Sequence, residues 1–589
     1  MSGKRSRAFR AFQKVKTLKP SRSLFDLSHE VLLTADMFKL YPICAMEMSP
    51  GDTFHIANQS VTRLQPLNAP VMSRIEQCTH YFFVPYRILD ENWTEFITGG
   101  VEGEFGGTRR SDSHVDSDGI LDEPSEVAPV LPRWVPSDGK NGVGSLWDYF
   151  GLPVNVDPKG AYPLDYLRRA YNLIWNEFYR DENLQEEVGL DNEDILYRSW
   201  KKDYFTSALL SQQRGVAPAM PISGTVDVFG DQETVPLTGF TVLNSSSYSW
   251  SITATVEIPK EGTNFNAPST INVSYTYHYG VSGTGTGIAD ATLLSVSSVD
   301  ANHVKVIYQI PYNYSAGNDL VSVTVNGSPV LGYYPITLGD FGEVGFQVKD
   351  LRQAFQIQKW LELANRGGVR YTEFLRAFFG VSPRDDRLQR PEYIGGSRSP
   401  IVISEVLQTS STENEPTPQG YLAGHGLGAE RTYIGSYSAQ EYGVLIGLMS
   451  YVTPPVYTQG INRMWLRRSK YDFLFPQFTH LSEQAIEGAE IFATGTESEN
   501  RKVWGFNEVY DELRAMTSKV VGKMRTTFEY WHLARKFENK PALNSDFISG
   551  KDVSKRIFAV QSEEGIICHY ANIIRAVRPL PKYGTPGGV

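Results

Sequence analysis

Cysteine is scarce in this sequence, and its placement excludes the sites that cysteines usually build. Three cysteines occur among 589 residues, and none belongs to a CxxC motif. An odd number of widely spaced cysteines argues against a disulfide framework and against a cysteine zinc site. We therefore expect Cys44, Cys78 and Cys568 to be reduced, buried thiols in a cytosolic setting.

Long hydrophobic runs are also missing. The longest, YGVLIGLMSYV at residues 442–452, is too short to cross a bilayer and contains glycine and serine, so we predict no membrane span. The N-terminus lacks the apolar core of a secretory signal, but its arginine-rich, acid-free character resembles an organellar transit peptide. A targeting tail therefore stays open as one interpretation of the N-terminus.

Motifs for catalysis and for cofactor binding are absent from the sequence. The ten histidines form no HExxH pair and no cluster with cysteine, and no GxSxG nucleophile elbow occurs. GTGTG at residues 283–287 and GHGLG at residues 424–428 lack GxGxxG spacing, and we interpret both as flexible loops. The sequence thus predicts a protein that is not an enzyme, with no catalytic residue, no cofactor and no metal.

Two acidic stretches imitate functional sites. Residues 114–125 resemble a calcium loop, but His114 stands at the first position and Ser125 replaces the closing glutamate, so we favour a solvated acidic loop. Asp385 and Asp386 lie among arginines in RDDRLQR. Those arginines would hold both carboxylates ionised, so we predict surface or interface ion pairs rather than a catalytic pair.

Charge is distributed unevenly along the chain. The formal net charge is −10, yet no acidic residue precedes Asp26. A basic segment of this kind is expected to bind a polyanion. A mobile, solvated tail is the alternative. The eight basic residues of the segment are Lys4, Arg5, Arg7, Arg10, Lys14, Lys16, Lys19 and Arg22.

The composition indicates a mainly β protein. Aromatic residues make up 12% of the chain and charged residues only 21%, with 51 glycines and 33 prolines, a profile of many strands and turns. Turn residues bound strands near 53–61 and 71–85, and we interpret residues 99–145 as a long surface loop. Apolar residues at helical spacing predict three helices, at 163–183, at 349–368 with Asp350 as N-cap, and at 372–379.

Residues 222–345 differ in character from the rest. Arginine is absent from this stretch, serine and threonine are abundant, and apolar residues alternate strictly in strands near 250–258, 271–279, 304–310 and 321–325. Asn326-Gly327 follows the last of these as an expected hairpin turn. We therefore predict an inserted β-rich domain with an antiparallel sheet.

Several long motifs resemble one family, the major capsid proteins of the Microviridae, in particular of the gokushovirus-like branch of these small single-stranded-DNA bacteriophages. The most specific is LRQAFQIQKWLELANRGGVRYTEFLRAFFGV followed by RLQRPEYIGG, within residues 351–396. The others are PGDTF (50–54), FFVPYRILDENWTEFITG (82–99), RAYNLIWNEFYRDENLQ (169–185), KDYFTSAL (202–209) and VRPLPKYGTPG (577–587).

This resemblance implies an eight-stranded viral jelly roll, an antiparallel β-sandwich with long loop insertions and a few helices. The implied parts are a genome-facing basic arm (1–25), the first part of the jelly roll (26–221), an inserted surface or protrusion domain (222–345), and the second part with the C-terminal tail (346–589). Sixty copies would form a T=1 icosahedral shell around a circular single-stranded DNA genome. The eight basic residues of the arm are then the predicted DNA-binding residues, which would contact phosphates, and Phe9 and Phe12 are suited to stacking on unpaired bases.

The resemblance also implies partners and a location. The expected partners are a minor capsid or pilot protein, small basic DNA-packaging and scaffolding proteins, and a receptor on the host cell surface. The protein would belong to the virion and assemble in the bacterial host cytoplasm, with threefold protrusions from the insert that stabilise the shell or contact the host. The alternative is a carbohydrate-binding or hydrolytic β-protein with a basic targeting tail.

Overall fold

The fold consists of two compact units, which are described separately. In the computed structural model, one unit comprises Met1–Pro218 with Phe355–Val589, and the other comprises Ala219–Ala354. The structure describes residues 21–99, 130–215, 348–368, 370–407, 422–479 and 483–583, together with the strands between residues 240 and 332.

The first unit is built around a β-sandwich. Its first sheet has the order β1, β18, β4, β14, with β2 also paired to β18; its second sheet continues from β14 as β13, β5, β15, β3. β13 joins the two sheets, because it pairs with β5 over its first part and with β14 over its last. The strands are β1 Ser23–Asp26, β2 His29–Ala35, β3 Tyr41–Met48, β4 Thr53–Leu64, β5 Ile75–Pro85, β13 Glu392–Leu407, β14 Leu422–Ser438, β15 Gly443–Val452 and β18 Ile566–Arg578.

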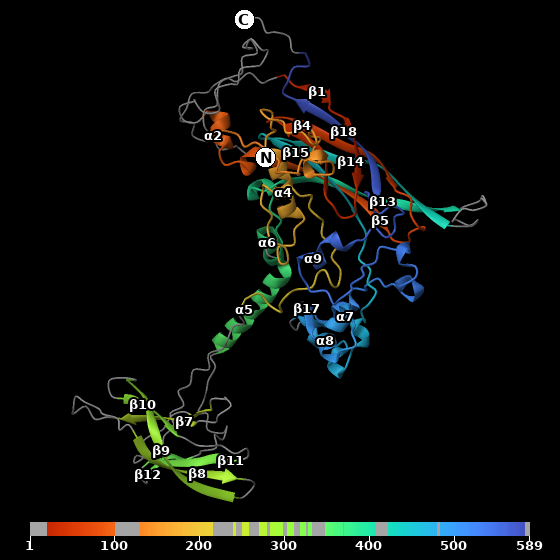
Figure 1. The fold of residues 1–589 in the computed structure, drawn as a ribbon. Helices are drawn as coiled ribbons and strands as arrows, with labels where there is room; N and C mark the ends of the chain where they lie inside the picture. Colours follow the sequence, from red (N-terminus) through yellow and green to blue (C-terminus); the bar gives the residue numbers. More distant parts are fainter. Residues whose placement is uncertain are drawn as a thin grey trace, which may run out of the picture. The chain divides into compact units, whose positions relative to one another are not determined.

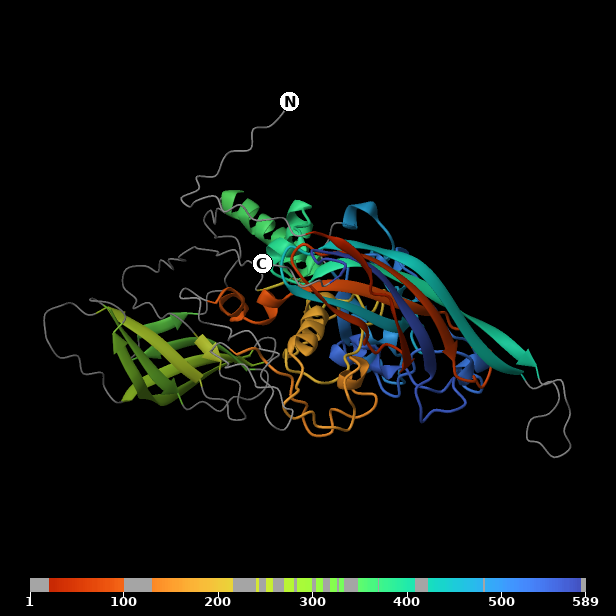
Figure 2. The same cartoon turned by 90° about the horizontal axis from the view of Figure 1, so that it is seen from above.

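This arrangement is the predicted jelly roll. β1 and β2 pair with one end and the other of β18, so they form one interrupted edge strand and the sandwich has eight strands. The chain passes back and forth between the sheets in the manner of a jelly roll, with antiparallel pairing throughout. Figure 1 and Figure 2 show the curled sheets, with the C-terminal strand β18 between β1 and β4.

The space between the two sheets is the main core. Inward positions of β4 alternate with exposed ones, so that Phe54, Ile56 and Leu64 are buried. Polar side chains inside the core satisfy one another: the Thr62 hydroxyl donates to Gln77 Oε1 at 2.7 Å, and the Gln77 amide donates to Ser60 at 2.9 Å. Paired in this way, the buried polar groups avoid most of the cost of losing water.

Helices cover the outer face of the second sheet. Phe82, Val84 and Ile446 point away from the main core and join a second core cluster with Trp147 and Tyr171. The cover comes from α1 (Tyr86–Leu89), α2 (Trp93–Thr98), α3 (Leu146–Tyr149) and α4 (Tyr166–Phe178). Trp134 is also buried in this cluster and anchors the end of the predicted surface loop 99–145, whose residues 130–145 otherwise lie at the surface without helix or strand. Residues 100–129 lie outside the described part.

The long connection between β15 and β18 forms a third core. Tyr204, Tyr457, Trp504 and Phe547 pack together there, although they lie far apart in sequence. The regular elements of this region are β16 Gln484–Glu487, β17 Val503–Asn507, α7 Gly488–Ile491, α8 Glu497–Arg501 and α9 Ser545–Ile548, joined by short 3-10 turns.

The second unit contains a seven-stranded antiparallel sheet with the order β12, β11, β8, β9, β10, β7, β6. All four strands predicted there are present, and Val325 pairs with Ser328 across the expected hairpin, whose turn residues lie outside the described part. The strands are β6 Phe240–Val242, β7 Trp250–Glu257, β8 Thr270–Tyr279, β9 Gly283–Ser298, β10 His303–Ile310, β11 Asn318–Val325 and β12 Ser328–Gly332.

The two glycine-rich stretches are strands, so their interpretation as flexible loops is wrong. GTGTG begins β9, and GHGLG lies in β14. In β14 the alternate glycines face inward, where a Cβ atom on Gly424 would lie 2.4 Å from the Ala69 carbonyl oxygen. Glycine is needed there because another backbone approaches the strand closely.

The three predicted helices are present as α4, α5 (Val348–Gly367) and α6 (Tyr371–Phe379). Asp350 lies inside α5 rather than at its N-cap. Gly380 ends α6 in the left-handed conformation, with φ of 67°, as its position after the last apolar residue suggests.

Candidate functional site

The basic arm reaches the described structure only at Arg22. The other predicted DNA-binding residues, from Lys4 to Lys19, lie outside the described part. Arg22 is exposed, and its guanidinium lies 3.2 Å from the place that a Cβ atom would take on Gly51. The next residue, Ser23, pairs with Arg578 at the end of β18. The arm therefore joins the fold at the edge of the first sheet.

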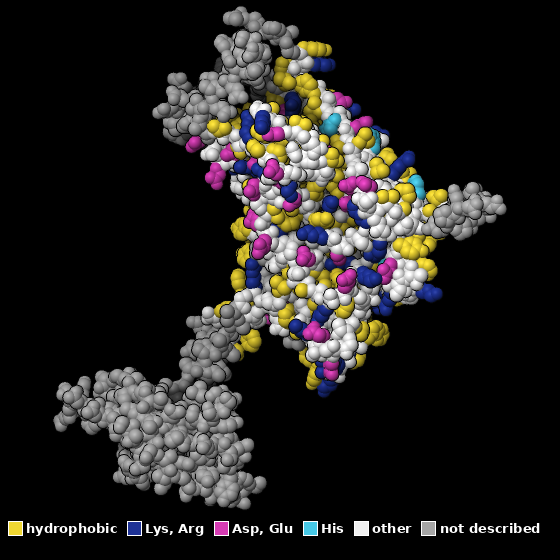
Figure 3. Space-filling view, in the orientation of Figure 1, with side chains coloured by type: hydrophobic (Ala, Val, Ile, Leu, Met, Phe, Trp, Pro, Cys, Tyr) yellow, Lys and Arg dark blue, Asp and Glu magenta, His cyan; other side chains and the backbone are white. Residues whose placement is uncertain are grey.

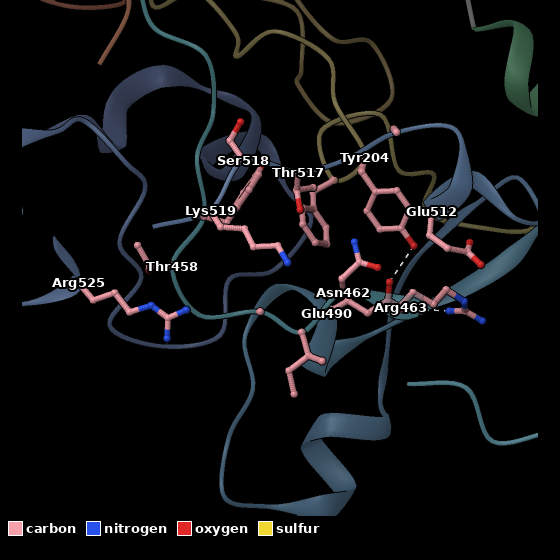
Figure 4. A pocket seen from close by; sticks show the side chains of 15 residues that line it. Tyr204, Thr458, Asn462, Arg463, Glu490, Glu512, Thr517, Ser518, Lys519 and Arg525 are labelled. Atoms are coloured by element: carbon pink, nitrogen blue, oxygen red, sulfur yellow. Dashed lines mark hydrogen bonds and ion pairs between the residues drawn. The ribbon is translucent and has the colours of Figure 1, made fainter. Parts of the chain in front are cut away.

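A small enclosed pocket lies in the third core (Figure 4). The Tyr204 hydroxyl donates to Glu490 Oε2 at 2.8 Å, and Arg463 Nη1 lies 2.9 Å from Glu490 Oε1. Glu512 accepts a hydrogen bond from Gln484 at 2.8 Å and pairs with Arg467 at 3.5 Å. Both carboxylates therefore have donors within the protein.

This pocket is suited to holding the fold together rather than to binding a substrate. Its volume of about 30 Å³ is that of a single water molecule. Burial raises the pKa of Glu490, and the neighbouring Arg463 guanidinium opposes that shift. The backbone N–H of Glu487 also donates to the Glu490 carboxylate, at 2.8 Å. The cluster cross-links residues that are distant in sequence.

The aspartates of RDDRLQR form the predicted ion pairs. Arg384 lies 2.8 Å from Asp386, and Arg390 lies 2.6 Å from Asp385. Arg390 also lies over the ring of Phe178, with its guanidinium carbon 5.0 Å from the ring centre. These contacts fix the segment between α6 and β13. The calcium-like loop 114–125 lies outside the described residues.

The described part of the chain contains no candidate metal site and no candidate membrane span. No group of three or more histidine, cysteine, aspartate or glutamate side chains there could hold a metal ion. No helix there combines the length and apolar character needed to span a membrane. The three cysteines are free and buried, as predicted.

An exposed aromatic segment, residues 463–478, lies beside the third core. Trp465 is 77% exposed and Phe473 is 54% exposed, in a stretch of three 3-10 turns. Tyr471, Leu474 and Phe475 are exposed beside them. The capping box of Ser469 and Asp472 holds the segment in shape. We name it the aromatic loop; exposed apolar surface of this density usually marks a protein contact.

A second exposed apolar surface, the α5–α6 surface, follows these two helices. Trp360, Tyr371 and Phe379 are all exposed, and the tilted rings of Phe374 and Phe378 pack beside Trp360. The apolar stripe predicted on α5 is therefore mostly uncovered in the single chain, with Ala364 as its buried member. Neither surface was identified from the sequence, although the aromatic residues of MWLRRSKYDFLFPQF gave a signal for the first.

Comparison with known proteins identifies the family. The family described as capsid protein (F protein) matches residues 13–588. The capsid protein VP1 of Chlamydia phage 1 is 32% identical, over 98% of this chain and 97% of its own length. VP1 of Bdellovibrio phage phiMH2K is 30% identical, over 98% and 97%. The chain belongs to the phage capsid protein family. VP1 of Spiroplasma virus 4, at 28% identity over 96% of this chain, is a further relative.

Membership of the capsid protein family confirms the resemblance seen in the sequence. The chain is a structural protein of the virion and not an enzyme, so the hydrolytic alternative is set aside. Membership of a capsid protein family implies self-assembly into a capsid. The pocket of Figure 4 is then part of the scaffold that holds the aromatic loop.

Proposed function

We propose that sixty copies of this chain form a T=1 icosahedral shell around a circular single-stranded DNA genome. The observation that carries the proposal is the match to VP1 capsid proteins of small phages over 98% of the chain. The jelly roll supports it, because two compact sheets leave few free strand edges. A closed shell also multiplies modest contacts between identical copies.

The aromatic loop and the α5–α6 surface are the proposed contacts between copies. Trp465 and Phe473 lose their exposed apolar area when a neighbour covers them, and large aromatic side chains contribute most to such contacts. The insert would build protrusions at the threefold axes, which stabilise the shell or contact the host surface. The four-part division of the chain given above belongs to this proposal.

The arm, residues 1–25, is proposed to lie inside the shell and contact DNA phosphates without reading sequence. Sixty arms of eight basic residues supply about 480 positive charges, whereas a genome of thousands of nucleotides has one negative charge per phosphate. The arms neutralise only part of the genome. We propose that small basic packaging proteins supply further charge, with scaffolding and pilot proteins as additional partners in the host cytoplasm and a receptor outside.

Assembly is tested by electron microscopy and sedimentation of the expressed protein. The chain is expected to form shells, and the double variant Trp465→Ser/Phe473→Ser is expected to remain as small species. Val143→Ser is the control, because Val143 is 79% exposed but lies outside both proposed contact surfaces. Small species from the unmodified chain would contradict the proposal.

The arm is tested by deleting residues 1–22. Shells are expected to form but to retain less DNA, with weaker dependence of DNA binding on salt. A control arm with the same composition in scrambled order is expected to restore packaging, because phosphate contact needs charge rather than sequence. Undiminished DNA content after the deletion would show that the arm has another role.

A further inference from the structure

We propose that the outer face of the first sheet is a second contact surface for single-stranded DNA, separate from the arm. The inference rests on the proposed function, since it needs a DNA genome as partner. This surface, the open face, consists of the outward side chains of β18, β4 and β14. Its basic side chains are those of His55, Arg63, His425, Arg431, His569 and Arg575.

The strand register brings these side chains together. Arg575 pairs with His55, His569 pairs with Val61, and Gln59 pairs with Arg431. Directly opposed residues of an antiparallel pair share a face, with Cβ atoms about 5 Å apart. Residues 372 to 520 positions apart in sequence thus lie side by side on one surface. Figure 3 shows histidine, basic and hydrophobic side chains over the region of β18 and β14, together with Asp and Glu side chains.

The open face has no carboxylate on its three strands. Outward positions of β4, from Thr53 to Arg63, and of β18, from Ile567 to Val577, include no aspartate or glutamate, and the same holds for β14. This is unexpected in a chain with 66 acidic and 56 basic residues. The carboxylates on the adjoining edge strands are Asp26, which pairs in register with Arg575, and Glu30, which lies 3.1 Å from His569.

Arg63 and Arg431 differ from most arginines of this unit. Arg168, Arg463 and Arg468 each lie within 3 Å of a carboxylate oxygen. Within the described part of the chain, neither Arg63 nor Arg431 lies within 4.0 Å of one. Both are exposed. An anion brought by a partner would supply the missing counter-charge.

The remaining side chains suit a single strand of nucleic acid. Tyr433 is 61% exposed on this face, and Gln59 is exposed between Arg431 and β18. Aromatic rings and guanidinium planes stack on unpaired bases, while arginines contact phosphates, with little dependence on sequence. From His55 to Arg63 the strand rises about 27 Å, which is enough for several nucleotides.

Charge also favours DNA over a second copy of the chain. Two open faces packed on each other would bring the arginines of one copy close to those of the other, and like charges across an interface disfavour association. The arm enters the fold at β1, beside β18 of the same sheet. An arm and an open face on one sheet can hold the same DNA segment, which raises the effective concentration of each contact.

The test measures DNA binding by unassembled full-length subunits as a function of salt. The probe is a fluorescent oligothymidylate of about thirty nucleotides, several times one stacking site. For single-stranded DNA, log K falls with log salt by about 0.7 per phosphate contact. Arg63→Gln/Arg431→Gln/Arg575→Gln is therefore expected to reduce the slope by about 2, and each single variant by about 0.7.

Two controls separate position from charge. Arg74→Gln/Arg384→Gln/Arg501→Gln removes three exposed arginines that lie next to carboxylates and is expected to leave the slope unchanged. Arg63→Lys/Arg431→Lys/Arg575→Lys keeps the charge and is expected to retain most of the slope. The single variants keep the test decisive if the triple variant does not fold.

Combination with the arm deletion distinguishes the two proposals. If the open face binds DNA, chains lacking residues 1–22 retain a salt-dependent component that the triple variant removes. Loss of all binding on arm deletion alone, or an unchanged slope in the triple variant, would overturn the open-face proposal while leaving the arm proposal intact. Unchanged binding on arm deletion would overturn the arm proposal and leave the open face standing.

Discussion

The outer faces of the two sheets differ in what covers them. The second sheet lies under α1, α3 and α4, and its residues Phe82 and Ile446 are buried on that side. On the first sheet the described residues leave the outer side open, with Leu32 79% exposed and Ile567 50% exposed. The same chain thus covers the outer face of one sheet and leaves the outer face of the other exposed.

The residue patterns of the strands reflect this difference in cover. β15, GVLIGLMSYV, is buried on both faces and reads as one continuous apolar run. β4, TFHIANQSVTRL, alternates between buried and exposed positions. A strand that is covered on both faces can be apolar throughout, whereas a strand with one exposed face can carry polar residues at every second position. The longest apolar run of the sequence is therefore a core strand.

Loss of the helical cover should have the largest effect on subunit stability. Trp147 is fully buried, packs on Trp134 at 5.0 Å and donates to the Pro153 carbonyl at 2.8 Å. Trp147→Ala is expected to lower the free energy of unfolding by about 3–5 kcal/mol, because it leaves a cavity and an unpaired carbonyl. Urea unfolding of the unassembled subunit measures it.

The matched control is Trp465→Ala, the same substitution at a side chain that is 77% exposed. It is expected to change the free energy of unfolding by less than about 0.5 kcal/mol, although it should impair assembly. Equal losses for the two variants would show that the helical cover contributes nothing specific to the second sheet.

Substitution of the inward glycines of β14 should have the next largest effect on the stability of the subunit. A methyl group on Gly424 would meet the Ala69 carbonyl oxygen and Pro70, which are backbone and cannot rotate away. Gly424→Ala is expected to destabilise the subunit by about 1–3 kcal/mol. Gly495→Ala, where nothing lies within 4 Å of the added atom, is the control and should be close to neutral in the same unfolding measurement.

The glycines show where prediction from sequence stops. Bounding turn residues correctly predicted β4 and β5, and period-two alternation predicted the four insert strands. Helical spacing predicted α4 within its quoted range. The interpretation of GHGLG as a flexible loop failed because glycine carries no side chain to show which face is buried. Gly424 is explained only by the backbone of residues 69 and 70, which approaches the strand closely. The prediction of Asp350 as N-cap was wrong because α5 begins at Val348, before the start of its apolar stripe.

The candidate surfaces were less predictable than the fold. The basic arm is contiguous, so its eight cations were visible, but only Arg22 lies in the described part. The open face combines His55 with Arg575, which are adjacent only through the pairing of β4 with β18. Sequence spacing cannot reveal that pairing, since it depends on the order of strands across the whole sandwich.

Lowering the pH should reduce the free energy of unfolding through His80, which lies on the covered second sheet. Burial, with lesser contributions from Arg198 and Arg398, lowers the pKa of His80 from 6.5 to about 4. Below pH 6.5 the imidazole of the unfolded chain binds a proton, whereas that of the folded chain stays neutral until about pH 4. The contribution of His80 to the free energy of unfolding is therefore present above pH 6.5 and is lost as the pH falls toward 4. At pH 5 the loss is about 2 kcal/mol.

The variant His80→Gln tests this assignment. Glutamine does not titrate and can still reach the Tyr179 hydroxyl, which lies 2.6 Å from His80 Nδ1. The difference in unfolding free energy between pH 7.5 and pH 5 should shrink by about 2 kcal/mol relative to the parent. His55→Gln on the open face serves as the exposed control, and an equal change in that variant would contradict the assignment to burial.

The smallest effect is expected on the open face, at Tyr433. A bulge in β14 between residues 433 and 435 turns Tyr433 outward and Tyr437 inward, where Tyr437 packs on Phe83 at 4.8 Å. In urea unfolding, Tyr433→Ala should cost less than about 0.5 kcal/mol and Tyr437→Ala about 2 kcal/mol or more. Equal costs would mean that part of the same chain already covers the open face, which would remove the contrast between the two sheets and leave DNA no surface to bind there.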